Sequence, residues 1–318
     1  MVPLAEIETA RARLPSAVIR TPLLYSEELS ERAGAPIYFK CENLQVTGSY
    51  KARAAFTILD RLGPEQRPRG AALSSSGNFA SAFAYMGRLL GIPTAVVMME
   101  KTARLKVEKC RRYGAEIVFC PNQWEERWRT LDRLQSERGI LAVNTFESEA
   151  VIAGHGTLGL EIMDDLPEVG TVLVPVSSGG LIGGLATAVK ERRPAARVVG
   201  VQPTGSNAAT LSFQRGEVTR IPAVETICDA LIAQAPGHLP FAHIQRYVDE
   251  MALVSDDETK AAIAWLAENA KLVVEAGGAV AAAALLTRRV RPQGPSVCLL
   301  SGGNIAPATL SACLAEAA

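Results

Sequence analysis

The feature that most constrains this chain is the alternation of short apolar runs rich in β-branched residues with longer segments of helical periodicity. Such alternation is typical of βαβ units, whose largely parallel strands are buried between helices. The expected strands cover residues 37–39, 71–74, 94–99, 116–119, 141–143, 171–176, 197–201 and 296–300. The expected helices cover residues 51–62, 80–90, 103–113, 124–137, 156–165, 180–192, 257–270 and 279–288. We therefore predict an α/β fold with mostly parallel sheets.

Charge and hydropathy exclude several classes of partner. The chain of 318 residues carries 33 basic and 33 acidic side chains, which argues against binding to nucleic acid or to an anionic membrane surface. No apolar run approaches the roughly 18 residues that a membrane span needs. The N-terminal segment indicates an amphipathic helix and lacks the features of a signal peptide. We expect a cytoplasmic protein.

The six cysteines show no metal-binding pattern. They form no C-x-x-C pair, and no histidine lies at zinc-ligand spacing from them. We expect no bound metal and buried thiols in a reducing compartment, although the sequence leaves a disulfide pair open.

The segment between residues 71 and 143 suggests a second domain. It holds three consecutive βα units, enough for a small sheet of its own. We predict a small α/β domain over residues 69–143, inserted into a larger domain formed by residues 1–68 and 144–318.

Turns rich in serine and glycine follow three of the expected strands. Their sequences are SSSGNF from Ser74, SSGGLIGG from Ser177 and SGGN from Ser301. Ligands of open α/β sheets bind at the carboxyl ends of strands, and small residues at a helix N-terminus let backbone N–H groups approach an anion. The turn at Ser177 is thus a candidate phosphate site, and that at Ser74 a candidate carboxylate or phosphate site. The alternative is that the glycines only permit tight turns and close packing.

The sequence gives little support to the hypothesis that these turns bind a nucleotide. The turn from Ser177 lacks the G-x-G-x-x-G fingerprint, and the following expected strand ends in Gln202, where an acidic ribose ligand would be needed. The P-loop pattern is also missing.

Lys51 is the candidate nucleophile. It follows Thr47 and Ser49, either of which could cap a helix whose first turn would contain the lysine. The helix dipole and burial would lower the pKa of its amine, and a neutral lysine attacks carbonyl groups. The alternative is an exposed helix lysine, the usual situation for a lone lysine.

Several motifs together resemble one enzyme family. CENLQVTGSYKARAAF, SSSGNFA, AVIAGHGTLGLEI, VPVSSGGLIGG, VVEAGGAVA and CLLSGGN occur in this order. They resemble the motifs of fold type II pyridoxal-phosphate enzymes, in the branch of threonine and serine dehydratases and serine racemases. The resemblance implies two open, twisted, mostly parallel α/β domains with the active site between them.

The resemblance also implies roles for individual residues. Lys51 would bind the cofactor covalently and move protons at the substrate Cα, with Ser76 as a second catalytic group on the opposite face. Cofactor contacts would come from Asn78 at the ring hydroxyl, Ser301 at the ring nitrogen, and Glu275 in the late turn. The phosphate would be held by Ser177, Ser178, Gly179, Gly180 and Leu181. The amino-acid substrate would contact Ser75, Ser76, Gly77, Asn78, Phe79 and Phe146.

Some positions depart from the family pattern. Phe79 and Phe146 replace groups that are usually polar, which predicts a site suited to apolar or aromatic β-substituents. Arg127 is the candidate cation that would bind an acidic β-substituent. Gln202 stands where some relatives have an acidic cation ligand, so we expect no cation there. His155 replaces a common glutamine and could be catalytic, although packing or hydrogen bonding is the simpler role.

The resemblance implies a pyridoxal-phosphate ammonia-lyase that acts on a β-hydroxy amino acid such as threonine, serine or phenylserine. An amino-acid racemase on the same fold is the alternative, and a non-catalytic or NAD-type nucleotide-binding protein is the alternative from another class. We expect a homodimer. Because only a short segment follows Asn304, no C-terminal regulatory domain is expected.

Overall fold

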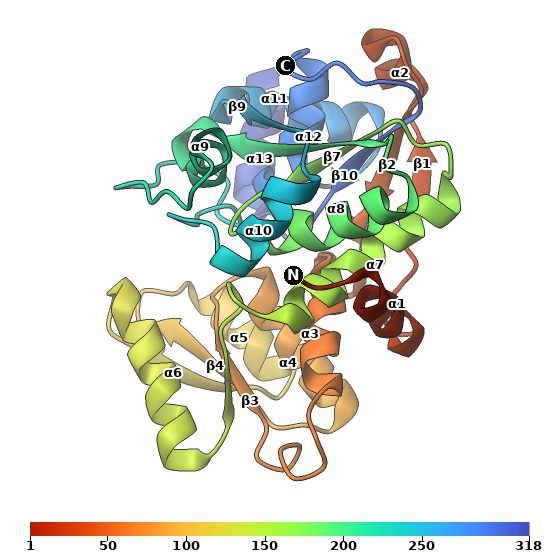
Figure 1. Ribbon diagram of the computed structural model, residues 1–318. Coiled ribbons are helices and arrows are strands. Elements are labelled where there is room, and N and C mark those ends of the chain that lie inside the picture. Colours follow the sequence, from red (N-terminus) through yellow and green to blue (C-terminus); the bar gives the residue numbers. More distant parts are fainter. Residues whose placement is uncertain (318) are drawn as a thin grey trace.

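The structure, a computed structural model, describes residues 1–317 and consists of two lobes, each built around its own sheet (Figure 1). One sheet has six strands in the order β1-β2-β10-β7-β8-β9, and the other has four in the order β5-β4-β3-β6. The larger sheet contains β1 (Leu23–Tyr25), β2 (Ile37–Cys41), β7 (Thr171–Pro175), β8 (Arg197–Pro203), β9 (Glu250–Val254) and β10 (Ser296–Leu300). The smaller sheet contains β3 (Ala71–Ser74), β4 (Thr94–Met99), β5 (Glu116–Cys120) and β6 (Leu141–Val143).

All strand pairs are parallel except β1 with β2. The predicted α/β fold is therefore confirmed, and every expected strand is present. Two strands were not predicted, namely the edge strands β1 and β9. β1 is an edge strand of three residues that pairs only with β2. So short a strand shows too few residues for an apolar alternation to be recognised in the sequence.

Helices cover both sheets. They are α1 (Leu4–Arg13), α2 (Glu27–Ala33), α3 (Lys51–Asp60), α4 (Asn78–Leu90), α5 (Arg104–Arg112), α6 (Trp124–Arg138), α7 (Glu149–Asp165), α8 (Gly180–Arg192), α9 (Ala208–Arg215), α10 (His238–Tyr247), α11 (Asp256–Asn269), α12 (Ala276–Leu286) and α13 (Pro307–Ala317). Three single 3-10 turns complete the list, at Glu42–Leu44, Val46–Gly48 and Thr204–Ser206. The expected helices are all present; α7 begins earlier than predicted because Ser148 caps it by accepting from Val151 N–H.

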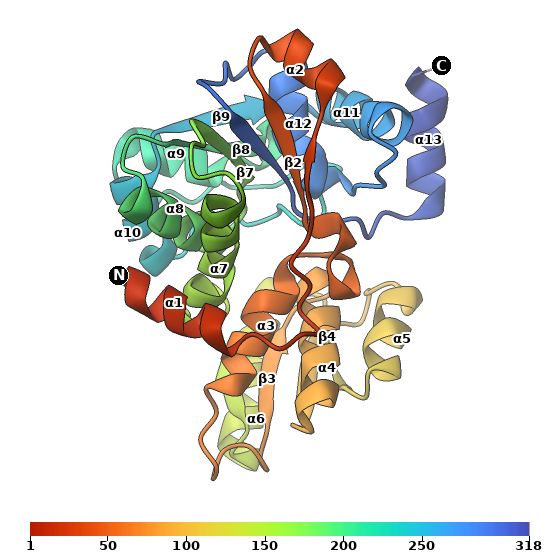
Figure 2. The same cartoon turned by 90° about the vertical axis from the view of Figure 1, so that its right-hand side faces the viewer.

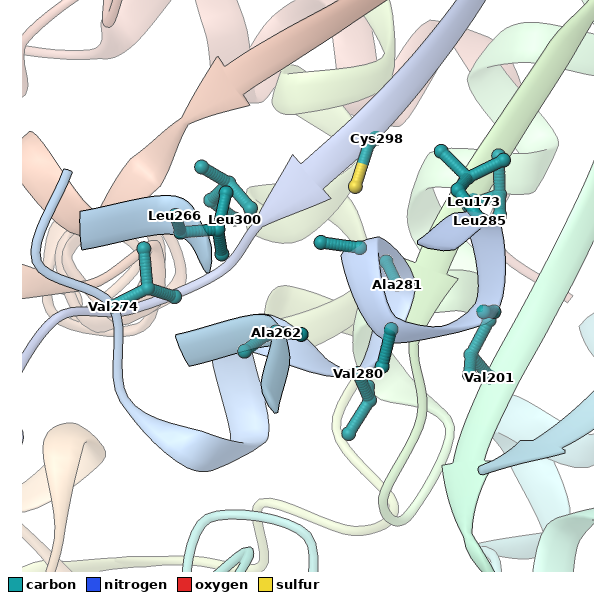
Figure 3. Packing of buried hydrophobic residues seen from close by; sticks show 14 of the residues in the cluster. Leu173, Val201, Ala262, Leu266, Val274, Val280, Ala281, Leu285, Cys298 and Leu300 are labelled. Carbon is teal, nitrogen blue, oxygen red and sulfur yellow. The ribbon is translucent and has the colours of Figure 1, made fainter. Parts of the chain in front are cut away.

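The core of the larger lobe surrounds α12. This helix is apolar on all sides and buried, as expected for a helix enclosed by other elements. Its side chains pack among residues of β7, β8, β10 and α11 (Figure 3). The predicted buried thiols are confirmed: within residues 1–317 the six cysteines are buried and unpaired.

The core of the smaller lobe includes α3, which precedes residue 69. Ala52, Phe56 and Leu59 of this helix share a buried cluster with Phe83 of α4 and Leu73 of β3. Figure 2 shows α3 beside α4 and β3 in this lobe. The predicted domain boundaries at residues 69 and 143 stay a prediction. The packing places the helix that begins with Lys51 against the smaller sheet. In residues 1–317, no helix is long and apolar enough to cross a membrane.

Candidate active site

A pocket lies between the two lobes, beside the turns that follow β3 and β7. Its lining combines the turn after β3, the turn after β7, the start of α3 and parts of α6 and α7. The predicted site residues that line it are Lys51, Ser75, Ser76, Gly77, Asn78, Phe79, Phe146, Ser177, Ser178, Gly179, Gly180 and Leu181. Residues far apart in the chain thus form one cavity.

Two predicted site residues do not line this pocket. Glu275 is buried behind Asn78, whose Nδ2 donates a hydrogen bond of 2.6 Å to Glu275 Oε1. Ser301 is buried and adjoins Tyr50, and its carbonyl oxygen accepts a hydrogen bond of 3.2 Å from Tyr50 N–H. Glu275 and Ser301 are therefore each bonded to a residue that lines the cavity.

Lys51 is the first residue of α3, but neither Thr47 nor Ser49 caps the helix. The capping position belongs to Tyr50, which makes no side-chain capping bond, so that prediction was wrong. The hydroxyls of Thr47 and Ser49 are buried and have no hydrogen-bond partner among the described residues. The backbone explains this: Thr47 has φ +67°, and Ser49 is extended and pairs with Gly302. Tertiary contacts, rather than a capping side chain, fix the start of α3.

The surroundings of Lys51 favour the neutral amine. Burial lowers the pKa of Lys51 from 10.5 to about 8, while the negative charge of Glu275 acts in the opposite direction. The Nζ atom lies 4.4 Å from the ring centre of Tyr50 and 5.1 Å from that of Phe79. The predicted direction of the pKa shift is confirmed, with desolvation as its main cause. A neutral fraction of Lys51 near physiological pH makes it a competent nucleophile and proton acceptor.

The turn after β7 forms one anion-binding cradle. Gly179 has φ +99°, which turns the chain sharply into α8 at Gly180. The N–H groups of the first helical turn have no acceptors within the helix, and the dipole favours an anion there. Gly184 has a different role, because a Cβ there would lie 2.1 Å from the carbonyl oxygen of Ile152. This glycine allows α7 and α8 to pack closely.

The turn after β3 brings a second helix N-terminus to the pocket. Helix α4 begins at Asn78 with Gly77 at the capping position. Ser75 Oγ accepts a hydrogen bond of 3.3 Å from Gly77 N–H, which shapes the turn, while Ser76 is exposed. Lys51 thus faces a cavity bordered by two helix N-termini, each of which favours an anion.

A chain of polar contacts closes one side of the site. Asn304 Nδ2 donates to Asn78 Oδ1 at 2.8 Å, and Lys109 Nζ donates to Asn304 Oδ1 at 2.8 Å. Burial and the charge of Asp229 raise the pKa of Glu275 to about 7. Asn78 is therefore held from both ends of its side-chain amide.

An aromatic wall lines the mouth of the pocket. The ring of Phe146 meets those of Trp124 and Trp128 edge-on, with centres 6.4 and 6.1 Å apart. The Arg127 guanidinium lies over Trp124 and donates to Ser74 Oγ at 2.6 Å. Sequence reasoning missed Tyr50, Trp124 and Ile232 as lining residues. The proximity of Tyr50 to Lys51 in sequence was the available signal; Trp124 and Ile232 reach the pocket only through tertiary packing.

The position of Gln202 is filled by protein contacts. Its Oε1 accepts from Thr210 N–H and from the Thr210 hydroxyl, and its Nε2 donates to the Val176 carbonyl at 3.3 Å. In the part of the chain that the structure describes, no group of three or more His, Cys, Asp or Glu residues could hold a metal ion.

Comparisons with known proteins agree with this arrangement. The family model described as "Pyridoxal-phosphate dependent enzyme" matches residues 14–302. An L-threonine ammonia-lyase of Geobacter sulfurreducens is 43% identical over 312 residues, which cover 98% of this chain and 78% of that protein. A catabolic L-threonine dehydratase of Staphylococcus aureus is 35% identical over 310 residues, covering 96% and 90%. The solved structure of maize serine racemase superposes with a TM-score of 0.93 at 32% identity, covering 99% and 97%.

Proposed function

Because this chain belongs to the family of pyridoxal-phosphate-dependent enzymes, we propose that it eliminates water from a β-hydroxy amino acid, with threonine as the first candidate. The products would be a 2-oxo acid and ammonia. The observation that carries the proposal is Lys51, whose pKa is lowered to about 8 and which faces a cavity between two anion-binding helix N-termini. The names of the relatives, which include threonine ammonia-lyases, support the same reaction.

The residues around the pocket fit pyridoxal phosphate, which is the cofactor of this family. The start of α8 offers backbone N–H groups that suit a phosphate, and Gly179 takes the positive φ that turns the chain into this helix. In our proposal the phosphate binds to Ser177, Ser178, Gly179, Gly180 and Leu181, and Lys51 Nζ provides the covalent attachment. Asn78 would hold the ring hydroxyl and Ser301 would face the ring nitrogen. When bound, the cofactor supplies an electron sink that stabilises negative charge at the substrate Cα.

The protein would contribute positioning and proton transfer. N–H groups of the turn from Ser75 to Asn78 would hold the substrate carboxylate at the start of α4. Once the substrate amine has replaced Lys51 Nζ on the cofactor, the freed neutral amine would accept the proton from Cα, and the loss of hydroxide from Cβ would complete the elimination of water. The enamine product hydrolyses to the 2-oxo acid and ammonia. A neutral hydroxyl at Ser301, in place of a carboxylate, would leave the ring nitrogen unprotonated and so favour elimination over transamination.

The pocket wall bears on the choice of substrate. Phe79, Phe146 and Trp124 present apolar rings to the cavity, which supports acceptance of an apolar or aromatic β-substituent such as that of phenylserine. Arg127 lines the same cavity without a carboxylate partner among the described residues. The competing substrate to compare is therefore 3-hydroxyaspartate, whose acidic group Arg127 could attract.

A release assay tests this function. The holoenzyme would be incubated with L-threonine, L-serine, phenylserine and 3-hydroxyaspartate, and each 2-oxo acid would be quantified. We expect 2-oxobutanoate from threonine, turnover of phenylserine, slower turnover of 3-hydroxyaspartate, and no turnover by Lys51→Ala. Release of no 2-oxo acid from any β-hydroxy amino acid would contradict the proposal, and a clear preference for 3-hydroxyaspartate would contradict the assigned specificity.

Racemisation is the second candidate, and Ser76 is the observation that favours it. A racemase needs a proton donor on each face of Cα, and Ser76 lines the same pocket as Lys51. An exposed serine hydroxyl is a weak acid and base, so we expect elimination to dominate. The test measures D-serine and pyruvate together from L-serine. Ser76→Ala should abolish D-serine formation and largely retain pyruvate formation; more D-serine than pyruvate from the wild type would reverse this ranking.

Assembly and location complete the proposal. We propose a homodimer in the cytoplasm and a small inserted domain over residues 69–143. Light scattering of the purified holoenzyme tests the dimer, with a monomer at micromolar concentration as the contrary result. Cell fractionation tests the location, and limited proteolysis with cleavage near residues 69 and 143 tests the domain boundaries.

A further inference from the structure

His155 of α7 is a buried polar residue that the described protein groups leave unsatisfied. Its side chain is 1% exposed, and among the described residues neither Nδ1 nor Nε2 has a partner in hydrogen-bonding geometry, although the Gly180 backbone lies close enough to act on the pKa of the ring. Most buried side-chain polar atoms in proteins are hydrogen-bonded, because leaving one unpaired after desolvation is costly. His243, also buried, illustrates the usual situation: its Nε2 accepts from Val2 N–H, and its Nδ1 contacts the Thr187 hydroxyl. An unpaired imidazole therefore calls for a ligand.

The neighbours of His155 indicate where that ligand binds. The imidazole lies against the rings of Tyr50 and Phe79, with centres 4.7 and 6.1 Å away, and these contacts leave its nitrogens unsatisfied. Its Nδ1 lies beside the first residue of α8, only 3.8 Å from where a Cβ on Gly180 would stand. His155 also lines the cavity that contains Lys51. The ring thus borders the anion-binding turn of α8.

The neutral state of the His155 imidazole suits hydrogen bonding to an anion. Burial and the nearby positive charge of Lys51 hold the pKa of His155 well below 6.5, so the imidazole is neutral at physiological pH. A neutral imidazole keeps one N–H donor and one acceptor nitrogen. It can donate to an anion without bringing a further buried charge into the site.

We infer that His155 is a phosphate ligand of the cofactor, donating one ring N–H to a phosphate oxygen at the first turn of α8. The inference rests on the phosphate position in our proposed function and is independent of which amino acid the enzyme converts. A carboxylate of the substrate is the competing ligand. It is disfavoured because Nδ1, a polar atom of the ring, is the atom beside Gly180 at the start of α8, whereas the ring meets α4 through the apolar ring of Phe79.

A binding comparison tests the phosphate contact directly. Full-length enzyme would be freed of cofactor and titrated with pyridoxal phosphate and with pyridoxal, which lacks the phosphate, following the absorbance of the bound form. We expect His155→Leu to weaken pyridoxal phosphate binding about 10- to 100-fold, as loss of one hydrogen bond to a charged group implies. Pyridoxal binding should stay within about twofold of the wild type, a difference below the cost of a lost hydrogen bond. His155→Gln, which keeps an N–H donor, should retain most of the phosphate-dependent affinity.

The matched control is His238→Leu, because His238 is exposed and should affect neither ligand. Equal weakening of both ligands by His155→Leu, or no weakening of either, would overturn the phosphate contact. A failed 2-oxo acid assay would leave these binding results unaffected, so the two proposals fail separately.

A second measurement covers the case in which His155→Leu does not fold. The wild-type chain contains three histidines, so ¹⁵N-histidine labelling gives a simple spectrum, which His155→Gln and His238→Leu would assign. We expect the His155 ring nitrogens to shift when pyridoxal phosphate binds and to shift much less with pyridoxal. Identical shifts with the two ligands would contradict the inference.

Discussion

The buried amine of Lys51 predicts that this residue destabilises the folded chain. We expect Lys51→Met to be more stable than the wild type at pH 7 when both are free of cofactor. Methionine fills a similar volume beside Tyr50 and Phe79 and places no charge there. The cost of holding the ammonium in this site follows from its pKa, which burial lowers from 10.5 to about 8. Because one pKa unit corresponds to 1.36 kcal/mol, the cost is about 3 kcal/mol at pH 7.

The lowered pKa of Lys51 also sets the direction of this stability effect and the pH range over which it changes. Between pH 8 and 10.5 the unfolded chain binds a proton at Lys51 that the folded chain has released. Wild-type stability therefore rises with pH through this window. By pH 10 the gain from Lys51→Met should fall below about 1 kcal/mol, since the folded wild type then holds a neutral amine.

Urea unfolding of the cofactor-free proteins at pH 7 and pH 10, followed by tryptophan fluorescence, measures both effects. Lys101→Met is the matched control, because Lys101 is exposed and its removal should leave stability nearly unchanged. A Lys51→Met protein no more stable than the wild type at pH 7 would refute the reasoning. So would a gain that is equally large at pH 10.

The remaining predictions concern groups that support the site. Burial raises the pKa of Glu275 to about 7, so between pH 5 and 7 the folded chain binds a proton that the unfolded chain lacks. The free energy of unfolding should therefore rise as the pH falls from 7 to 5. Glu275→Gln should flatten this trend in urea unfolding. Gly184→Ala should cost about 2 kcal/mol or more, because its Cβ would lie 2.1 Å from the Ile152 carbonyl oxygen. Gly63→Ala, which meets nothing within 4 Å, should leave the Tm unchanged, and similar Tm values for the two variants would contradict the packing argument. Arg53→Met should cost about 3–5 kcal/mol in urea unfolding, because it leaves buried Glu42 without its salt-bridge partner and Glu161 with Lys40 alone; a cost below about 1 kcal/mol would contradict this.

Much of the site could be predicted from the sequence because its groups follow local rules. Glycine and serine at the ends of expected strands located the turns at Ser74 and Ser177, and both line the pocket. Lys51 was placed in the first turn of a helix, as observed. The helix cap was mispredicted because capping propensity assumes a free local choice of backbone. Here the backbone before α3 is held by Ser301 and Gly302 on a distant strand end.

The sequence by itself determined the alternation of strands and helices, since apolar periodicity and turn residues act over a few positions. Tertiary structure decided what depends on neighbours far along the chain. It set the edge strands β1 and β9, the meeting of Trp124 and Ile232 at one pocket, and the burial that lowers the pKa of Lys51. It also left the His155 nitrogens without a partner in hydrogen-bonding geometry within residues 1–317. Burial and hydrogen-bond satisfaction are properties of the assembled fold, so no local pattern encodes them.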